Sequence, residues 1–390
     1  MLNNTLNTVC NYDRNIMTNE TVRQSNIELL RIISMVLIIM FHISYHGNWG
    51  NGGIYYPDCL NVNTFFLQCL IPFGKVGVNI FVLISGYFLI NSTKSTWPKI
   101  AKLWIQMLFY SVTISFIFFM FDEQTITMRE LFRIFTPTIS FVWWFASTFL
   151  FMFALSPFIN KAILACDEKT HIKLIIGLVI IWSIIPSSIN INLEVSNLGW
   201  FITLYVIASY FKLYPHRFNK KTTTYFIIAI MAYLTIIMIT YLVDITHYSS
   251  DFWFISNPID HNHRQNSILI LVISCCLFLT FSKIQIKNSK IINSIASTTF
   301  GIYLIHDHDY VRWKIYSDIF NCYDYTYSDL LIPYVFFMTA TIFIICMMID
   351  YLRQLLFEKS TILTKLSKQA LTLQSKIDLY ISKIIKSNND

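Results

Sequence analysis

Four ionisable side chains lie within one apolar stretch, Asn26 to Gly47: Glu28, Arg31, His42 and His46. An imidazole titrates near neutral pH and can accept a proton or attack a carbonyl carbon, and a guanidinium can hold a phosphate. The stretch is long enough to cross a bilayer, where ionisable groups normally face a bundle interior or a water-filled cavity because contact with lipid costs several kcal/mol. These residue types therefore indicate chemistry inside a membrane helix.

Arg31 and His42 fall on one face of the predicted helix. They are eleven residues apart, which places them within about 20° of each other around the helix and about 16 Å apart along its axis. Glu28 lies about one turn before Arg31, and His46 lies about one turn after His42. The four side chains therefore predict a polar stripe across most of the membrane.

Three simpler interpretations of these residues stay open. Arg31, near a helix end, can extend its guanidinium to the lipid headgroups. His42 can be a neutral imidazole that is hydrogen-bonded in the protein core. His42 and His46 have a spacing that suits a metal, but this helix offers no third ligand at that depth, so we expect no metal site.

The rest of the chain supplies the helices that must position these groups. Of its 390 residues, 55% are hydrophobic and only 13% are charged, a composition typical of a polytopic membrane protein. We predict an all-α fold in which about ten transmembrane helices form one bundle. The expected spans are 27–46, 64–91, 100–121, 141–160, 172–187, 197–213, 224–243, 267–282, 292–308 and 331–351.

The basic residues orient this bundle. Most of the 29 Lys and Arg fall in alternate loops and in the terminal segments, which predicts that these loops and both termini are cytoplasmic. We divide the chain into a polar N-terminal segment (1–25), a transmembrane domain (26–353) and a basic amphipathic tail (354–390). The tail is expected to lie on the inner leaflet, with a partner-binding helix as the alternative. This asymmetry accounts for the net charge of +7 without a nucleic-acid partner.

Arg31 and His42 also carry a resemblance to a known family. The pattern R-IISMVLIIMF-H that joins them is similar to the signature of acyltransferase family 3, membrane enzymes that O-acylate cell-surface and exported glycans. The stretches FGKVGVNIFVLISGYFL (73–89) and ASTTFGIYLIHDHDYVR (296–312) resemble the same family. The similarity keeps its order over nearly the whole chain, and the exopolysaccharide and capsule O-acetyltransferase branch is the most similar. Ala208 departs from this pattern, because related sequences have Gly there.

The resemblance implies an integral membrane O-acyltransferase, a multi-pass protein of the bacterial cytoplasmic membrane. Acetyl-CoA from the cytosol would be the co-substrate, with no bound cofactor, and a hydroxyl of a polysaccharide or lipid-linked sugar would be the acceptor. The implied partners are membrane lipids, acyl-CoA and the polysaccharide biosynthesis machinery. No esterase-type domain is expected after the last span, so transfer would be completed within the membrane unit.

Within this interpretation, the two ends of the stripe take different roles. Arg31 would hold a phosphate of CoA, and the thioester arm would extend along the helix toward His42. His42 would act as a general base on the acceptor hydroxyl or, less favoured, as a nucleophile that carries the acyl group. The lipid bilayer separates donor from acceptor, and a polar stripe across the membrane suits that problem.

The second span contributes two groups of supporting residues. Ser85, Gly86 and Tyr87 reach the cytoplasmic third and are expected to bind the acyl donor, with close helix packing as the alternative for Ser85. Lys75 and Asn79 lie one turn apart nearer the outer side. They are expected to face a polar cavity, with extension of the lysine to the headgroups as the alternative.

The outer end of the span 292–308 should lie at the level of His42. Tyr303 and His306 would bind the acceptor or steady the imidazole, and Arg312 would stabilise the developing oxyanion. Trp144, at the outer start of the fourth span, would stack on a sugar. The alternative for the end of the span 292–308 is a helix cap whose Tyr and His side chains lie at the lipid headgroups. The alternative for Trp144 is the belt of aromatic residues that is common at membrane interfaces.

Two other functional classes fit a bundle with charged groups at its centre. A transporter or flippase for polysaccharide or lipid-linked glycan is the main one, although such proteins often show paired repeats and discontinuous helices, and neither is apparent here. A non-catalytic membrane scaffold is the other, and it would not explain a cation and an imidazole on one helix face. Label transfer from acetyl-CoA to glycan separates these classes.

Overall fold

The computed structural model describes residues 23–47, 49, 61–92, 97–121, 127–186, 197–246, 264–358 and 372. Within these ranges the chain is helical and forms no strand, which confirms the all-α prediction. The helices are α2 (Ser25–His46), α3 (Val62–Leu89), α4 (Trp97–Phe121), α5 (Met128–Phe135), α6 (Trp144–Leu164), α7 (Glu168–Val179), α9 (Asn197–Leu213), α10 (Thr222–Thr246), α12 (Ile268–Lys283), α13 (Lys290–Ser297), α14 (Thr299–His306), α15 (Asp309–Trp313) and α16 (Leu331–Arg353). Short 3-10 and π segments are η1 (Ile180–Ile184), η3 (Pro215–Arg217), η4 (Lys314–Ile319), η5 (Cys322–Tyr325) and η6 (Gln354–Glu358).

Six of the described helices are long and apolar enough to cross a membrane: α2, α3, α4, α6, α10 and α16. This confirms a multi-pass membrane protein. The other four predicted spans are also helical but shorter, and they correspond to α7 with η1, to α9, to α12 and to α13 with α14. The count of ten spans and the cytoplasmic placement of the termini stay predictions, as do the three domain boundaries.

The outer helices expose apolar side chains, as expected where a protein contacts lipid. Along α10, Phe226, Ile227, Met231 and Met238 are each 45 to 58% exposed. A soluble protein rarely exposes so continuous an apolar face. The hydrocarbon of a bilayer is the environment that such a surface requires.

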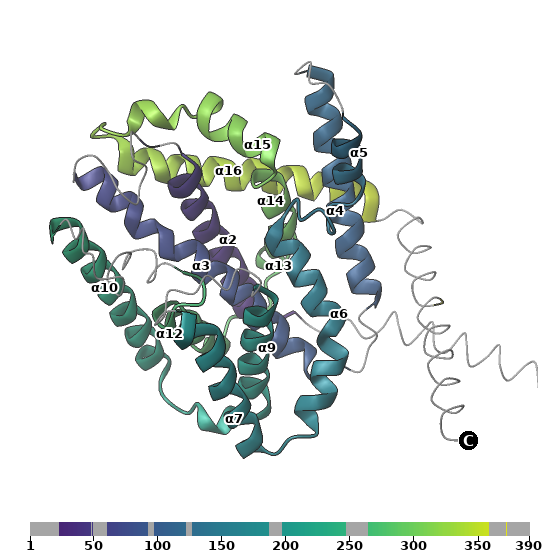
Figure 1. The fold of residues 1–390 in the computed structure, drawn as a ribbon, viewed down its shortest axis with the longest axis vertical. Coiled ribbons are helices and arrows are strands. Elements are labelled where there is room, and N and C mark those ends of the chain that lie inside the picture. The colour runs from purple at the N-terminus through teal and green to yellow at the C-terminus, as the bar shows by residue number, and fades with distance from the viewer. Residues whose placement is uncertain are drawn as a thin grey trace, which may run out of the picture.

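Helix α2 lies in the middle of the bundle (Figure 1), where it contacts α3, α12, α13, α14 and α16. Two glycines of α3 allow its close crossing with α2. A Cβ atom at Gly77 would lie 2.6 Å from the Ser34 carbonyl oxygen, and one at Gly74 would lie 2.3 Å from the Phe41 ring. Small residues at such crossings let helix backbones approach within a membrane. The crossing therefore fixes the position of α2 and of the ionisable groups that it carries.

The predicted span 292–308 is divided at Thr298 into α13 and α14. Three consecutive hydroxyl side chains hydrogen-bond to carbonyls three residues earlier: Ser297 to Ser294, Thr298 to Ile295 and Thr299 to Ala296. Such bonds compete with the helical backbone pattern and interrupt a helix locally. The interruption leaves α14 as a separate short helix against α2, α4 and α16.

Some predictions fall outside the described residues. These include the polar segment up to residue 22 and nearly all of the basic tail.

Candidate active site

The buried end of α2 meets the end of α14 through two histidines. Nδ1 of His42 lies 2.9 Å from Nε2 of His306, and both side chains are buried. Each ring belongs to a different helix, so the contact depends on the close packing of α2 and α14. The prediction that His306 reaches the level of His42 is confirmed by this distance.

A second hydrogen bond settles which nitrogen of each ring carries a proton. Nδ1 of His306 lies 2.6 Å from the carbonyl oxygen of Ile302. A carbonyl oxygen only accepts, so His306 must donate from Nδ1, and its Nε2 in the neutral ring must accept. The proton in the contact between the rings therefore belongs to Nδ1 of His42. This leaves Nε2 of His42 without a proton and able to act as a base.

Asp307, Arg312 and His46 join these two histidines, and the five residues are called the histidine cluster below. Oδ1 of Asp307 lies 3.7 Å from Nδ1 of His42, and Nη1 of Arg312 lies 3.2 Å from the same carboxylate oxygen. Nη1 of Arg312 also lies 3.5 Å from Nε2 of His46, the next residue along the stripe. Arg312 therefore holds one end of the cluster together through a carboxylate and an imidazole.

Arg312 is anchored in turn by a chain of ion pairs at the surface. Its Nη2 lies 2.5 Å from Oδ1 of Asp309, and the other oxygen of Asp309 pairs with Arg133 of α5. Thr127 and Glu130 form a capping box at the start of α5, which accounts for a helix where the sequence predicted a loop. The ion pairs thus connect α15 to α5 across the face of the cluster.

Two buried tyrosine hydroxyls close to the cluster make no hydrogen bond of ordinary geometry within the described structure. The Tyr303 hydroxyl lies near the Asp307 carboxylate without such a bond. The Tyr316 ring stacks near His46, with ring centroids 6.2 Å apart. Buried hydroxyls without partners are rare and require an explanation. A bound substrate with polar atoms would provide one.

The cluster also contains one group with metal-binding geometry. One ligand atom each from His42, His46 and Asp307 lie within 4.8 Å of one another. Sequence alone offered no third ligand, because Asp307 comes from a different part of the chain. Arg312 contacts both Asp307 and His46, and its positive charge opposes a cation at this position. The absence of a metal stays a prediction.

Arg31 lies near the opposite end of α2 and forms an ion pair with Glu28. Their closest atoms are 3.3 Å apart, and the Arg31 side chain is 31% exposed while that of Glu28 is 8% exposed. The two therefore form the second polar end of the predicted stripe. A continuous passage between Arg31 and His42 stays a prediction.

Of the three residues assigned to donor binding in α3, Ser85 hydrogen-bonds within its own helix, whereas Gly86 and Tyr87 contact α9. The Ser85 hydroxyl donates to the Phe81 carbonyl oxygen in its own helix at 2.9 Å. A Cβ atom at Gly86 would lie 3.0 Å from backbone atoms of α9, so this glycine permits close packing. Tyr87 lies beneath Lys212, whose Nζ is 4.6 Å from the ring centroid. Donor binding by these three residues stays a prediction.

Lys75 and Asn79 of α3 differ from each other in their surroundings. Nζ of Lys75 lies 4.6 Å from the Phe41 ring centroid, within electrostatic range of His42. The Asn79 amide is fully buried, donates to the Gln265 carbonyl oxygen and accepts from Trp200, each at 3.0 Å. Lys75 therefore lies beside the cluster, whereas Asn79 ties helices together.

At the start of α6, Trp143 approaches the cluster more closely than Trp144 does. Trp143 is fully buried, and its ring centroid lies 5.3 Å from that of His308 in an edge-on arrangement. Trp144 is half-buried and contacts Phe145 and Phe201. Stacking of Trp144 on a sugar stays a prediction.

Sequence reasoning also left several contributors outside the proposed site. The dense run of ionisable residues in HDHDYVR was the signal that could have included Asp307 and His308. Arg133 and Tyr316 gave no comparable signal. The additional residues in the histidine cluster or close to it are Arg133, Trp143, Asp307, His308, Asp309 and Tyr316.

The chain matches the family described as an acyltransferase domain, acyltransferase family 3, over residues 24–351. This match includes α2, which carries Arg31 and His42, and α14, which carries His306. No curated protein and no solved structure matches the chain. The family match covers most of the sequence, so it is not the coincidence of one short motif. The chain belongs to acyltransferase family 3, a family of membrane acyltransferases.

Proposed function

We propose that this protein transfers an acetyl group from cytosolic acetyl-CoA to a hydroxyl of a cell-surface or exported polysaccharide. The observation that carries the proposal is the hydrogen-bonded chain from the Ile302 carbonyl through His306 to His42. This chain leaves one nitrogen of a buried imidazole ready to accept a proton. Membership in an acyltransferase family supplies the reaction class.

The reaction requires one proton to move twice. The hydroxyl oxygen of the acceptor attacks the thioester carbonyl carbon, and Nε2 of His42 takes the hydroxyl proton at the same time. The tetrahedral intermediate then collapses, the C–S bond breaks, and His42 returns the proton to the departing CoA sulfur. His306 keeps the Nδ1 proton of His42 in place during both steps, so it is a positioning residue.

The groups around His42 have separate roles in this mechanism. The carboxylate of Asp307, 3.7 Å from Nδ1 of His42, stabilises the imidazolium that forms between the two steps. The hydroxyl of Tyr316 is the donor available to substrate oxygens, since it makes no ordinary hydrogen bond within the described residues. The hydroxyl of Tyr303 lies beside the Asp307 carboxylate. Arg312 is largely neutralised by two carboxylates, and we assign it to holding the cluster rather than to the oxyanion.

Arg31 is the residue that we assign to the donor. Its partly exposed guanidinium can exchange the ion pair with Glu28 for a phosphate of acetyl-CoA. Donor access from the cytosol follows from the predicted orientation, in which the start of α2 faces inward. A location in the bacterial cytoplasmic membrane is part of this proposal.

The test uses labelled acetyl-CoA and inside-out membrane vesicles that contain the protein and its glycan acceptor. Wild-type protein should place label on glycan, and His42→Ala should reduce the rate to background. His216→Ala is the matched control, because His216 is exposed in η3 and lies far from α14 in sequence. Wild-type turnover by the His42 variant, with equal amounts of folded protein, would refute the mechanism. Movement of glycan without label would instead support a flippase.

A further inference from the structure

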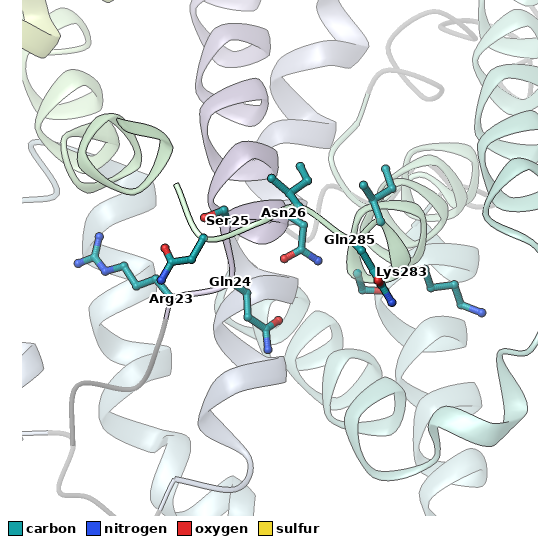
Figure 2. A pocket seen from close by; sticks show the side chains of 10 residues that line it. Arg23, Gln24, Ser25, Asn26, Lys283 and Gln285 are labelled. Carbon is teal, nitrogen blue, oxygen red and sulfur yellow. The ribbon is translucent and has the colours of Figure 1, made fainter. Parts of the chain in front are cut away.

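A cavity of about 600 Å³ opens beside the start of α2, away from the histidine cluster. Figure 2 shows it between the first residues of α2 and the segment that follows α12. Its lining is mostly polar and consists of Arg23, Gln24, Ser25, Asn26, Ser282, Lys283, Ile284, Gln285, Ile286 and Asn288. A volume of this size suits a small-molecule ligand.

The charge of the cavity favours an anion. Arg23 and Lys283 flank it on opposite sides in Figure 2, and none of the ten lining residues is acidic. Each cation also donates to backbone carbonyl oxygens beside the cavity, Arg23 to Asn293 and Lys283 to Phe218 and Lys220. These bonds hold the two charges in place at its edges. Helix α2 begins at the cavity without a side-chain cap on its N-terminal amides. Those amides carry the partial positive charge of a helix N-terminus. Glu28 in the first turn of α2 offsets part of it, and Glu28 is itself paired with Arg31.

The walls of the cavity are held together by specific hydrogen bonds. The Ser25 hydroxyl donates to Oδ1 of Asn293 at 3.0 Å and accepts from the Ser289 amide at 2.8 Å. The Asn26 side chain donates to the Phe281 carbonyl oxygen at 2.9 Å. These bonds tie α2 to both ends of the segment between α12 and α13. These hydrogen bonds therefore fix the positions of the two segments that form the cavity walls.

The cavity lies at the same end of α2 as Arg31. Arg23 lies eight positions before Arg31, or about 12 Å along a helix. Amide side chains of Gln24 and Gln285 lie between the two flanking cations and can hydrogen-bond a nucleobase or ribose. A ligand bound there would need phosphates for the cations and a polar ring system for the amides.

We propose that this cavity binds the phosphorylated nucleotide end of the acyl-CoA donor and thereby directs its thioester arm past Arg31. The assignment rests on the proposed function, because only a CoA-dependent enzyme requires such a donor. A phospholipid headgroup shares the phosphate but lacks a nucleobase. The side-chain amides of Gln24 and Gln285 can bind the nucleobase of CoA, and a phospholipid headgroup offers them no such group.

The test measures binding of CoA itself, which requires no catalysis. Full-length protein in nanodiscs of neutral lipid is titrated with CoA by calorimetry. Gln285→Glu should weaken binding about fivefold and Gln285→Lys should tighten it, because one charge is added to an exposed position at the cavity. Arg23→Gln should weaken binding about tenfold. Lys173→Gln removes an exposed charge of α7 outside the cavity lining and should change nothing.

The outcomes separate this inference from the proposed function. Equal CoA affinity in all five proteins, together with active wild-type transfer, overturns the cavity assignment alone. The expected order of affinities without any transfer by wild type supports the cavity and contradicts the proposed function. In nanodiscs that contain an anionic phospholipid, loss of CoA binding by competition would assign the cavity to lipid and overturn the inference.

Discussion

Nδ1 of His42 and Nε2 of His306 lie 2.9 Å apart, and the Ile302 carbonyl fixes the direction of the proton between them. The pair resembles a base and its orienting partner, with an imidazole in the place where a carboxylate is more familiar. A neutral partner leaves no extra charge in the apolar interior. Asp307, slightly farther away, supplies the negative charge.

Replacement of His306 should affect turnover more than substrate binding. His306→Leu removes the acceptor for the Nδ1 proton of His42, and we expect kcat to fall about 10²- to 10⁴-fold with little change in KM for acetyl-CoA. His306→Gln can still accept that proton through its amide oxygen and should retain part of the rate. Steady-state kinetics on both variants checks this. Equal losses in the two variants, or a loss confined to KM, would contradict a positioning role.

Tyr316→Phe should lower activity without lowering stability. Its hydroxyl is buried without an ordinary partner in the described structure, so its removal leaves no other group unpaired. If the hydroxyl binds substrate, the transfer rate should fall about tenfold, which corresponds to roughly 1.4 kcal/mol. The measurements are transfer rate and melting temperature in detergent.

Tyr334→Phe is the matched control for that experiment. The Tyr334 hydroxyl donates to the Phe320 carbonyl oxygen at 2.6 Å. Its removal should cost about 1 kcal/mol of stability and leave the transfer rate unchanged. The reverse pattern in the two variants would mean that the Tyr316 hydroxyl has a structural role.

Local sequence patterns predict single helices well in this protein. The predicted span 27–46 nearly coincides with α2, because a continuous apolar run of that length has few alternatives in a membrane. The separation of Arg31 from His42 follows from the same helix, since helical geometry fixes it. Such predictions require no knowledge of neighbouring helices.

Contacts between helices depend on rotations that the sequence does not specify. A shift of one residue turns a helical side chain by about 100°, which is enough to exchange the environments of Trp143 and Trp144. Gly86 shows the same difficulty, because a small residue suits both a ligand site and a helix crossing. The pairing of His42 with His306 was predicted only as a shared depth in the membrane.

The crossing of α2 with α3 should be sensitive to a single methyl group. Gly77→Ala would place Cβ 2.6 Å from the Ser34 carbonyl oxygen, so the helices must separate, at a cost of about 1–3 kcal/mol. Because α2 carries His42, transfer should fall as well. Gly177→Ala is the control, since a Cβ atom there meets no atom within 4 Å and should stabilise α7 slightly. The melting temperatures of the two variants test this prediction. Equal melting temperatures for Gly77→Ala and Gly177→Ala would contradict the tight crossing of α2 with α3.

Acidification should weaken the contact between α7 and η3. Arg217 donates to both oxygens of Glu168, at 2.6 and 3.0 Å, and this hydrogen bonding holds the pKa of the Glu168 carboxyl below its usual value. A carboxyl with a lowered folded-state pKa adds stability above its unfolded-state pKa and loses that stability as pH falls through the folded-state pKa. The difference in melting temperature between wild type and Glu168→Gln should therefore be largest near neutral pH and should shrink as the pH falls below the ordinary Glu pKa of about 4.3. Arg217→Gln should reduce this pH dependence to the smaller part that the Tyr210 hydroxyl contributes through its own hydrogen bond to Glu168. A difference that persists at low pH would show that the ion pair is not its source.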